Sequence, residues 1–346
     1  MKSVTIGDVA SHANVSKSTV SQYLNKRYDY MGEKTKERIE KAIKELGYHP
    51  NIVARSLKQK STKTIGIIVA NILHNFSTEV SRAIEDACNE QGFHLIVCNA
   101  DDEPEKEKNY IEMLRAKQVD GIIIFPTGGN KELYRKMLDE KYPVIFVDRS
   151  VEDVPITSIT LDNRKATRLA VQHFIDRGYK RIGIITTSII RDITPRVERI
   201  KGYRETIQDN SLQVEEAYVK SLEIEHIQDG LEEMLSLDEP PEAILAGNDL
   251  ALIEILKYVK EKRLEIPDDL AVIGIDDVSF ASFYTPTLTT VAQPTFEMGK
   301  KAADILLSNI LDKKAEGSLS EYCFEPKLIV RDSVGYGSDA KGRDTV

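Results

Sequence analysis

The chain has 346 residues, of which 41% are hydrophobic and 30% are charged, and its formal net charge at pH 7 is -9. This length predicts two or three domains, and the composition excludes collagen-like, coiled-coil and disordered classes. Because no apolar run approaches the roughly 20 residues that span a bilayer and no signal peptide precedes the first helix pattern, we expect a cytoplasmic protein without a membrane partner.

The charge is divided unequally along the chain. Residues 1–63 contain 13 Lys and Arg against 6 Asp and Glu, a balance of +7, which leaves 34 basic and 50 acidic residues, a balance of -16, for residues 64–346. Nucleic acids are polyanions and are bound by basic surfaces. The split therefore predicts a small nucleic-acid-binding module attached to a larger acidic body.

The basic segment begins with a pattern typical of two short helices. Thr5 and Asp8 have the spacing of a capping box that starts the first helix. Ser16 can cap the second, in which Val20 and Leu24 at i and i+4 can pack beneath the first. Two short helices joined this closely form a helix-turn-helix candidate.

The exposed face of the second helix carries small polar and basic side chains. Recognition helices meet base edges near their N-terminus, where Lys17 could donate to guanine and Gln22 suits the donor and acceptor pair of adenine. A solvated polar face is the alternative, and the coincidence of spacing, caps and positive charge favours DNA binding. The predicted DNA contacts of this motif are Thr5, Ser16, Lys17, Ser18, Thr19, Ser21, Gln22 and Asn25.

A third helix is predicted over about 33–46, with Gly47 at its C-terminal end. The next segment, 51–61, places Val53 and Leu57 at i and i+4 but is too short for a stable isolated helix. We expect it to become ordered only against a partner.

The basic head resembles the headpiece and hinge helix of the LacI/GalR family of bacterial repressors, through the motifs VTIGDVASHANVSKSTVSQYLN, ELGYHPN and ARSLK. The resemblance implies that two hinge helices of a dimer pair in the minor groove and that Leu57 wedges into the central base step. The alternative is a core contact of Leu57 with the next domain, which its basic neighbours disfavour. The predicted DNA contacts of the hinge are Asn51, Ala54, Arg55, Leu57 and Lys58.

From Ile65 onward, apolar strands alternate with amphipathic helices. The expected strands are IGIIVA, HLIVCN, DGIIIF and PVIFVD, with helices near 77–92, 104–118 and 130–142, and the rhythm restarts after Asp162 with RIGIIT, AILAGN and LAVIGID. Continuous apolar strands separated by helices are typical of parallel, doubly wound sheets that are covered on both faces.

This body also resembles the family, whose core is similar to a type I periplasmic sugar-binding protein. The predicted fold is an N-terminal all-α helix-turn-helix headpiece plus an α/β periplasmic-binding-protein-like core of two doubly wound parallel-sheet lobes. The resemblance implies a headpiece at 1–50, a hinge helix and linker at 51–61, an N-lobe at 62–161 and 293–323, a C-lobe at 162–292 and 324–336, and a tail at 337–346 that we expect to be disordered.

Motifs of catalysis and cofactor binding are missing from the sequence. It contains no GxGxxG at a strand-to-helix turn and no GxxxxGK[ST], GxSxG or HExxH, and its six His residues show no metal-ligand spacing. Cys88, Cys98 and Cys323 form neither an even set nor a CxxC pair, so we expect buried reduced thiols. We predict no enzyme activity, no cofactor and no metal.

Two doubly wound lobes normally bind a ligand in the cleft between them, beyond the carboxyl ends of the strands. Phe76 and Arg199 match family positions that hold the ligand, and Asp276 matches one whose carboxylate takes ligand hydroxyls. The carboxylates of Asp249 and Asp276 could instead only cap the following helices, and for Asp249 both roles stay open. The predicted effector contacts are Asn71, His74, Asn75, Phe76, Thr127, Arg149, Arg191, Arg196, Arg199, Asn248, Asp249 and Asp276.

The four arginines of this set predict an anionic effector, because converging guanidinium groups suit a carboxylate or phosphate. We expect a sugar acid or a phosphorylated sugar, and the nearest subgroup is that of ketodeoxygluconate- or hexuronate-responsive regulators.

The whole pattern predicts a nucleoid-associated homodimer that binds near-palindromic double-stranded operator DNA and represses a carbohydrate catabolic operon. Effector binding would close the cleft, unpair the hinge segments and release the DNA. Alternatives are a corepressor, a protein cofactor docked on the N-lobe and a solute-binding protein. The tail has no leucine heptads, so a coiled-coil tetramer is not expected.

Overall fold

The computed structural model describes residues 4–29, 31–49, 61–189, 193–311 and 321–337. The chain divides into two compact units, residues 1–62 and residues 63–346. The hinge segment from 51 to 60, Arg191 and the tail from 338 onward lie outside the described residues, so what the sequence indicates for them stays a prediction.

The first unit is a three-helix headpiece with α1 (Ile6–His12), α2 (Lys17–Leu24) and α3 (Glu33–Leu46). The capping box is present, since Thr5 donates its backbone N–H to Asp8 Oδ2 at 2.7 Å and its hydroxyl accepts from Asp8 N at 3.4 Å. Val9, Val20 and Ile39, one from each helix, are fully buried in the small core. The three helices predicted from sequence are therefore confirmed.

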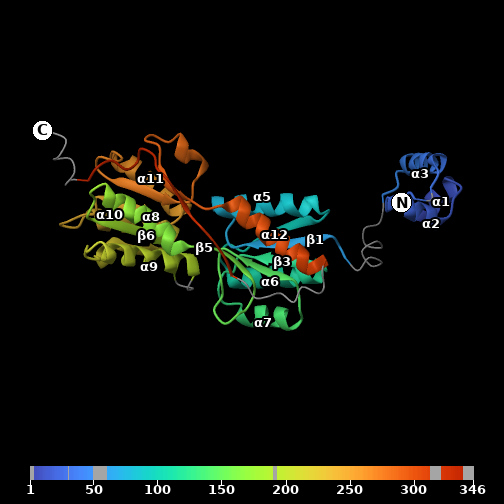
Figure 1. Ribbon diagram of the computed structural model, residues 1–346, viewed down its shortest axis with the longest axis horizontal. Coiled ribbons are helices and arrows are strands. Elements are labelled where there is room, and N and C mark those ends of the chain that lie inside the picture. Colours follow the sequence, from blue (N-terminus) through green and yellow to red (C-terminus); the bar gives the residue numbers. More distant parts are fainter. Residues whose placement is uncertain (1–3, 30, 50–60, 190–192, 312–320, 338–346) are drawn as a thin grey trace. The chain divides into compact units, whose positions relative to one another are not determined.

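The N-lobe of the second unit is built on a six-stranded parallel sheet in the order β11-β5-β4-β3-β1-β2. Helices α5 and α12 cover one face, and α6 and α7 cover the other (Figure 1), each pair through apolar residues packed against the sheet. The bounds are β1 (Thr64–Val69), α5 (Asn75–Glu90), β2 (His94–Asn99), α6 (Pro104–Ala116), β3 (Gly121–Ile124), α7 (Lys131–Asp139), β4 (Val144–Val147), β5 (Ser158–Leu161), α12 (Thr295–Leu311) and β11 (Glu321–Phe324).

The C-lobe repeats this architecture with a six-stranded sheet in the order β12-β10-β9-β8-β6-β7. Helices α10 and α11 cover one face, and α8 and α9 cover the other. The bounds are α8 (Asn163–Asp176), β6 (Ile182–Thr187), α9 (Thr194–Asp209), η1 (Glu216–Tyr218), β7 (Val219–Leu222), η2 (Ile224–His226), α10 (Ile227–Leu235), β8 (Ala243–Ala246), α11 (Asp249–Lys262), β9 (Ala271–Ile275), η3 (Ser279–Ser282), β10 (Thr289–Ala292) and β12 (Lys327–Ile329).

One edge of the C-lobe sheet differs from the wholly parallel sheet that we predicted, because β12 pairs with β10 in the antiparallel direction. The cause is the path of the chain. The chain leaves the C-lobe after β10 to form α12, and it returns from β11 of the N-lobe to form β12. Two neighbouring segments that cross the same gap in opposite directions must pair antiparallel.

The chain passes between the lobes three times, after β5, after β10 and after β11. These crossings lie at the carboxyl ends of the strands, the edge at which a ligand cleft of this architecture forms. Gly337, at the end of the described chain, donates its N–H to Arg177 O at 2.9 Å and is held against the C-lobe.

The three cysteines are free, as predicted, but only two of them are buried. Cys88 lies in α5 and Cys98 in β2, whereas Cys323 is exposed because β11 is an edge strand of its sheet. The expectation of a buried thiol is thus wrong for Cys323. Among the described residues, no helix is long and apolar enough to cross a membrane.

Candidate functional site

The candidate DNA-contacting surface lies on α2. Lys17, Ser18 and Gln22 are exposed there, while Val20 on the opposite side is fully buried. A Cβ atom on Gly7 would lie only 3.0 Å from Lys17 Cε, so the bare Gly7 backbone lets the Lys17 stem lie against α1. The first residues of α2 therefore expose their polar groups to solvent, while the helix itself is packed against α1.

The other predicted residues of this motif support the ends of the helices. Ser16 accepts a hydrogen bond from Thr19 N at 3.1 Å, and the two hydroxyls are 2.8 Å apart. Asn25 donates from Nδ2 to Ser21 O at 2.7 Å. Thr5 is exposed and belongs to the capping box of α1. The predicted hinge contacts Asn51, Ala54, Arg55, Leu57 and Lys58 lie outside the described residues.

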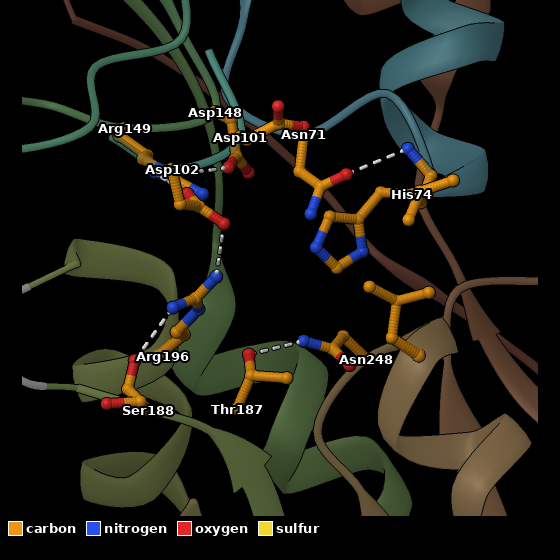
Figure 2. Close-up of polar contacts among 12 residues, drawn as sticks. Asn71, His74, Asp101, Asp102, Asp148, Arg149, Thr187, Ser188, Arg196 and Asn248 are labelled. Carbon is orange, nitrogen blue, oxygen red and sulfur yellow. Dashed lines mark hydrogen bonds and ion pairs between the residues drawn. The ribbon is translucent and has the colours of Figure 1, made fainter. Parts of the chain in front are cut away.

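The candidate effector site is a cavity of about 40 Å³ between the two lobes, which we call the inner cavity. A water molecule needs roughly 10–15 Å³ of such space, so the inner cavity has room for only a few waters. Figure 2 shows polar side chains in and around it, including His74, Arg149, Arg196 and Asn248, which come from both lobes. Seven predicted residues line it: His74, Phe76, Arg149, Arg196, Arg199, Asn248 and Asp276.

An aspartate that was not among the predicted residues joins two of the predicted arginines. Asp102, in the turn between β2 and α6, accepts from Arg149 Nη1 at 2.9 Å and from Arg196 Nη2 at 3.3 Å. Arg149 follows β4 in the N-lobe and Arg196 lies in α9 of the C-lobe, so Asp102 ties the lobes together across the inner cavity (Figure 2).

The electrostatics of this cluster depend on opposing effects. Burial would raise the pKa of Asp102, but the guanidinium groups of Arg149 and Arg196 outweigh burial and hold the pKa below its usual value. Burial, reinforced by the nearby Arg149 cation, lowers the pKa of Arg196 to about 10. Arg196 is therefore a desolvated cation whose hydrogen bonds go to Asp102 and to Ser188 O at 2.7 Å.

The Arg199 guanidinium donates to two acceptors that both belong to the C-lobe. It lies one turn further along α9 and donates to Asn163 Oδ1 at 2.8 Å and to Gly247 O at 2.6 Å. These contacts orient the guanidinium within the C-lobe while it still lines the inner cavity.

The N-cap role that was left open for Asp249 belongs to its neighbour, and the predicted contact of Asp249 with the effector stays a prediction. Asn248 is the N-cap of α11, since its Oδ1 accepts from Ala251 N at 2.8 Å. Asp249 instead accepts from His74 Nδ1 at 2.5 Å and from Asn75 N at 2.6 Å, both in the N-lobe. Asp249 therefore forms a second contact between the lobes. Burial raises its pKa, but the hydrogen bond from His74 outweighs this, and the net pKa is lowered.

Asp276 is not the cap of the helix that follows it, because η3 begins only after Val278. Its backbone has φ +85°, and its buried carboxylate accepts from Gln293 Nε2 at 2.6 Å and from Asp249 N at 3.3 Å. Burial, with a further contribution from the Asp249 carboxylate, raises the pKa of Asp276 to about 6. When it is protonated, which happens near and below pH 6, this carboxyl can donate to a hydroxyl group as well as accept from it, and the ionised form can only accept.

The remaining predicted residues divide into two groups. Phe76 packs edge-on against Phe125 with ring centroids 6.1 Å apart and forms an apolar wall of the inner cavity. Asn71 holds its own turn by accepting from Leu73 N at 2.9 Å (Figure 2). Thr127 does not line the inner cavity: its backbone N–H donates to buried Glu107 at 2.7 Å, and this contact turns the residue into the N-lobe. The expectation for Thr127 is therefore wrong.

Several residues that line or bridge the inner cavity were not predicted, among them Asp102, Phe125 and Gln293. Phe125 and Gln293 directly follow β3 and β10, so the strand-end rule that selected the other candidates also applies to them. Asp102 comes three residues after β2, and the only sequence feature that could have indicated it is the pair of consecutive aspartates, Asp101 and Asp102.

A helix-turn-helix headpiece attached to a two-lobed core with a polar cavity between the lobes defines a class of bacterial DNA-binding regulators. Family models agree: residues 5–51 match "Bacterial regulatory proteins, lacI family", and residues 171–334 match "Periplasmic binding protein-like domain".

Individual relatives extend this match over nearly the whole chain. "Probable HTH-type transcriptional regulator EndR" of Paenibacillus polymyxa is 48% identical over 333 residues, covering 95% of this chain and 98% of that protein. The HTH-type transcriptional regulator KdgR of Bacillus subtilis (strain 168) is 35% identical, covering 95% and 97%. The chain belongs to the lacI family and is an HTH-type transcriptional regulator.

Solved structures give the same result for the fold. The Lac repressor dimer bound to operator and the anti-inducer ONPF is similar with a TM-score of 0.82 and 26% identity, covering 96% of this chain and all of that one. The transcriptional regulator CelR in complex with cellobiose has a TM-score of 0.71 and 26% identity, covering 95% and 99%.

Proposed function

We propose that this regulator represses a carbohydrate catabolic operon and leaves its operator when an anionic, sugar-derived effector binds between the lobes. The observation that carries the proposal is the inner cavity, which brings together three guanidinium groups, those of Arg149, Arg196 and Arg199. Guanidinium groups hold carboxylate and phosphate bidentately. Asn248 and Asp276 add acceptors and donors suited to hydroxyl groups.

The lobes must move for such a ligand to enter. The inner cavity has room for only a few waters, and Arg196 already donates a hydrogen bond to the carboxylate of Asp102. An effector carboxylate could replace Asp102 at Arg196, which would exchange a contact within the chain for a contact with the ligand. Because Asp102 and Arg196 belong to different lobes, this exchange would couple effector binding to the relative position of the lobes.

Two structurally similar proteins support a carbohydrate ligand. The CelR structure contains cellobiose, and a second Lac repressor structure, with a TM-score of 0.83, contains ONPG in the repressed state. For this chain we propose a homodimer on a near-palindromic operator, because one recognition helix of the length of α2 contacts too few bases for a specific site. Light scattering of the protein with and without operator DNA tests the dimer.

Calorimetry tests the effector class. We expect binding of sugar acids such as gluconate, galacturonate or ketodeoxygluconate, or of sugar phosphates, and no comparable binding of the matching neutral sugars. Tight binding of an uncharged sugar alone would contradict the anionic class. Operator titration with the ligand that binds then gives the sign of the response: weaker DNA binding supports induction, and stronger DNA binding identifies a corepressor.

A further inference from the structure

A second cavity adjoins the inner one and is much larger. Its volume is about 680 Å³, compared with about 40 Å³ for the inner cavity, and Arg149 and Ile193 line both. Sites for small molecules typically have volumes of about 300–1,000 Å³. We call this space the outer cavity; it is bounded by residues that include Gly129, Lys131, Val151, Val197 and Lys201.

The floor of the outer cavity is a rigid loop without side chains. Gly128 and Gly129 have φ values of +78° and +110°, which favour glycine, and a Cβ on Gly129 would lie 3.2 Å from Pro104 Cβ. Glu107, which is fully buried, accepts from Thr127 N at 2.7 Å and also binds Tyr134. The loop is thus fixed in place before any ligand arrives, which lowers the entropy that binding costs.

The walls of the outer cavity combine apolar and charged groups. Val151 from the N-lobe and Val197 from the C-lobe are half-buried and can contact the apolar face of a sugar ring. Lys201 is paired with Glu198 at 2.8 Å. Lys131, at the first position of α7, has no ion pair within the described part of the chain. Its ammonium group is therefore a cation beside the loop of Gly128 and Gly129.

We propose that the effector is an acidic oligosaccharide of at least two sugar units. One unit occupies the inner cavity against Arg196 and Arg199, and the next occupies the outer cavity with its carboxylate at Lys131. This inference rests on the proposed function, and it deepens it by assigning the length of the ligand. Both lobes line the outer cavity, so the second unit also favours one relative position of the lobes.

Calorimetry on the full-length protein tests this with two pairs of ligands, galacturonate with digalacturonate and gluconate with cellobionate. We expect digalacturonate to bind about tenfold more tightly than galacturonate, as one additional charge-assisted contact in a half-buried site provides. The second unit of cellobionate is uncharged, so its gain over gluconate should be smaller and should come from the apolar walls alone. Lys131→Gln should remove most of that gain for digalacturonate and leave the affinity for galacturonate unchanged. Lys136→Gln is the matched control, since Lys136 is exposed on the same helix outside the cavity, and it should change neither affinity.

Val197→Trp provides a second variant, because the larger indole would take up part of the outer cavity where the second unit would lie. It should abolish the preference for both disaccharide acids. Equal affinities of the wild-type protein for one-unit and two-unit acids would overturn this inference and leave the proposed function standing. Binding of neither kind of acid would overturn both. A preference for two units that survives both Lys131→Gln and Val197→Trp would also overturn the inference, because the second unit would then lie elsewhere.

Discussion

The carboxylate of Asp102 lies between two guanidinium groups that belong to different lobes. To reach them, the chain adopts left-handed backbone conformations at two consecutive residues, Asp101 with φ +51° and Asp102 with φ +55°. Such conformations cost of order 1–3 kcal/mol for residues other than glycine and persist where other contacts compensate. The ion pairs of Asp102 with Arg149 and Arg196 provide that compensation here. The Asp102 side chain therefore both offsets the backbone strain of its own turn and forms a contact between the lobes.

Asp102→Asn should therefore destabilise the protein and increase its affinity for anions. Loss of the charge leaves Arg196 buried with a neutral partner, which we expect to cost about 2 kcal/mol at pH 7 in urea unfolding. Because the pKa of Asp102 is lowered in the folded protein, this stabilisation is present above the unfolded pKa and is lost as the pH falls through the folded pKa. Asp101→Asn, on the exposed part of the same turn, is the control. A larger effect of Asp101→Asn would contradict this account.

Asp276 should produce the opposite dependence on pH. Its folded pKa of about 6 lies above the unfolded value, so the folded protein binds the proton more tightly. The stability of the wild type relative to Asp276→Asn should then fall as the pH rises from about 4 to 6 and remain constant above, with a total change of roughly 3 kcal/mol. Urea unfolding of both proteins at several pH values measures this. A difference that does not change with pH would show that Asp276 titrates as it does in the unfolded chain.

At the scale of whole elements, the strands that form uninterrupted apolar runs between polar turns were predictable. The shorter strands β5, β7, β10, β11 and β12 were not predicted, because polar residues or shortness leave them without such a run. The run HLIVCN coincides with β2, and the capped pattern over 33–46 coincides with α3. Helix ends were less predictable. The segments expected at 104–118 and 130–142 end as helices at Ala116 and Asp139, because left-handed turns follow at Gln118 and Lys141 without the glycine that usually marks them.

The candidate site could be predicted only in part, for a related reason. The strand-end rule finds residues such as Arg149, which follow a strand directly. It fails for Thr127, because a buried carboxylate from α6 turns that loop inward, and sequence alone does not show which acidic residue of an amphipathic helix is buried. The partnership of Asp102 with Arg196 depends on the packing of two lobes across 94 residues of sequence.

Helix α9 carries Arg196 and Arg199, and its position depends on a close approach to α8. A Cβ on Gly202 would lie 2.8 Å from both the Cα and the carbonyl oxygen of Arg164, which are backbone atoms that cannot rotate away. We expect Gly202→Ala to push α9 from α8, to cost about 2 kcal/mol and to weaken binding of any ligand in the inner cavity. Thermal unfolding and calorimetry measure these effects. Gln208→Ala, at an exposed position of α9, should leave both unchanged.

At the scale of the whole molecule, the division of charge favours DNA binding by the headpiece and disfavours it in the rest of the chain. The basic balance of residues 1–63 attracts phosphates, whereas the acidic balance of the remaining chain repels them. We therefore expect operator affinity to fall steeply with salt, and Lys17→Gln to weaken operator binding about tenfold and to reduce the salt slope by about one if Lys17 contacts a phosphate. Lys201→Gln changes an exposed lysine outside residues 1–63, and it should leave the operator affinity and its salt slope unchanged when both are measured by fluorescence anisotropy. Equal effects of both substitutions would contradict the division.

The chain connects the two lobes by three crossings, and we propose that effector binding and DNA binding both depend on the relative position of these lobes. If the effector and the operator favour different relative positions of the lobes, each must weaken the binding of the other by the same factor. We expect a factor of about 5–150, which corresponds to a coupling free energy of about 1–3 kcal/mol. Operator titration with and without saturating effector gives one factor, and effector calorimetry with and without operator gives the other. Asp102→Asn should change both factors equally, because Asp102 contacts both lobes; unequal changes would show that the two ligands respond to different states of the protein.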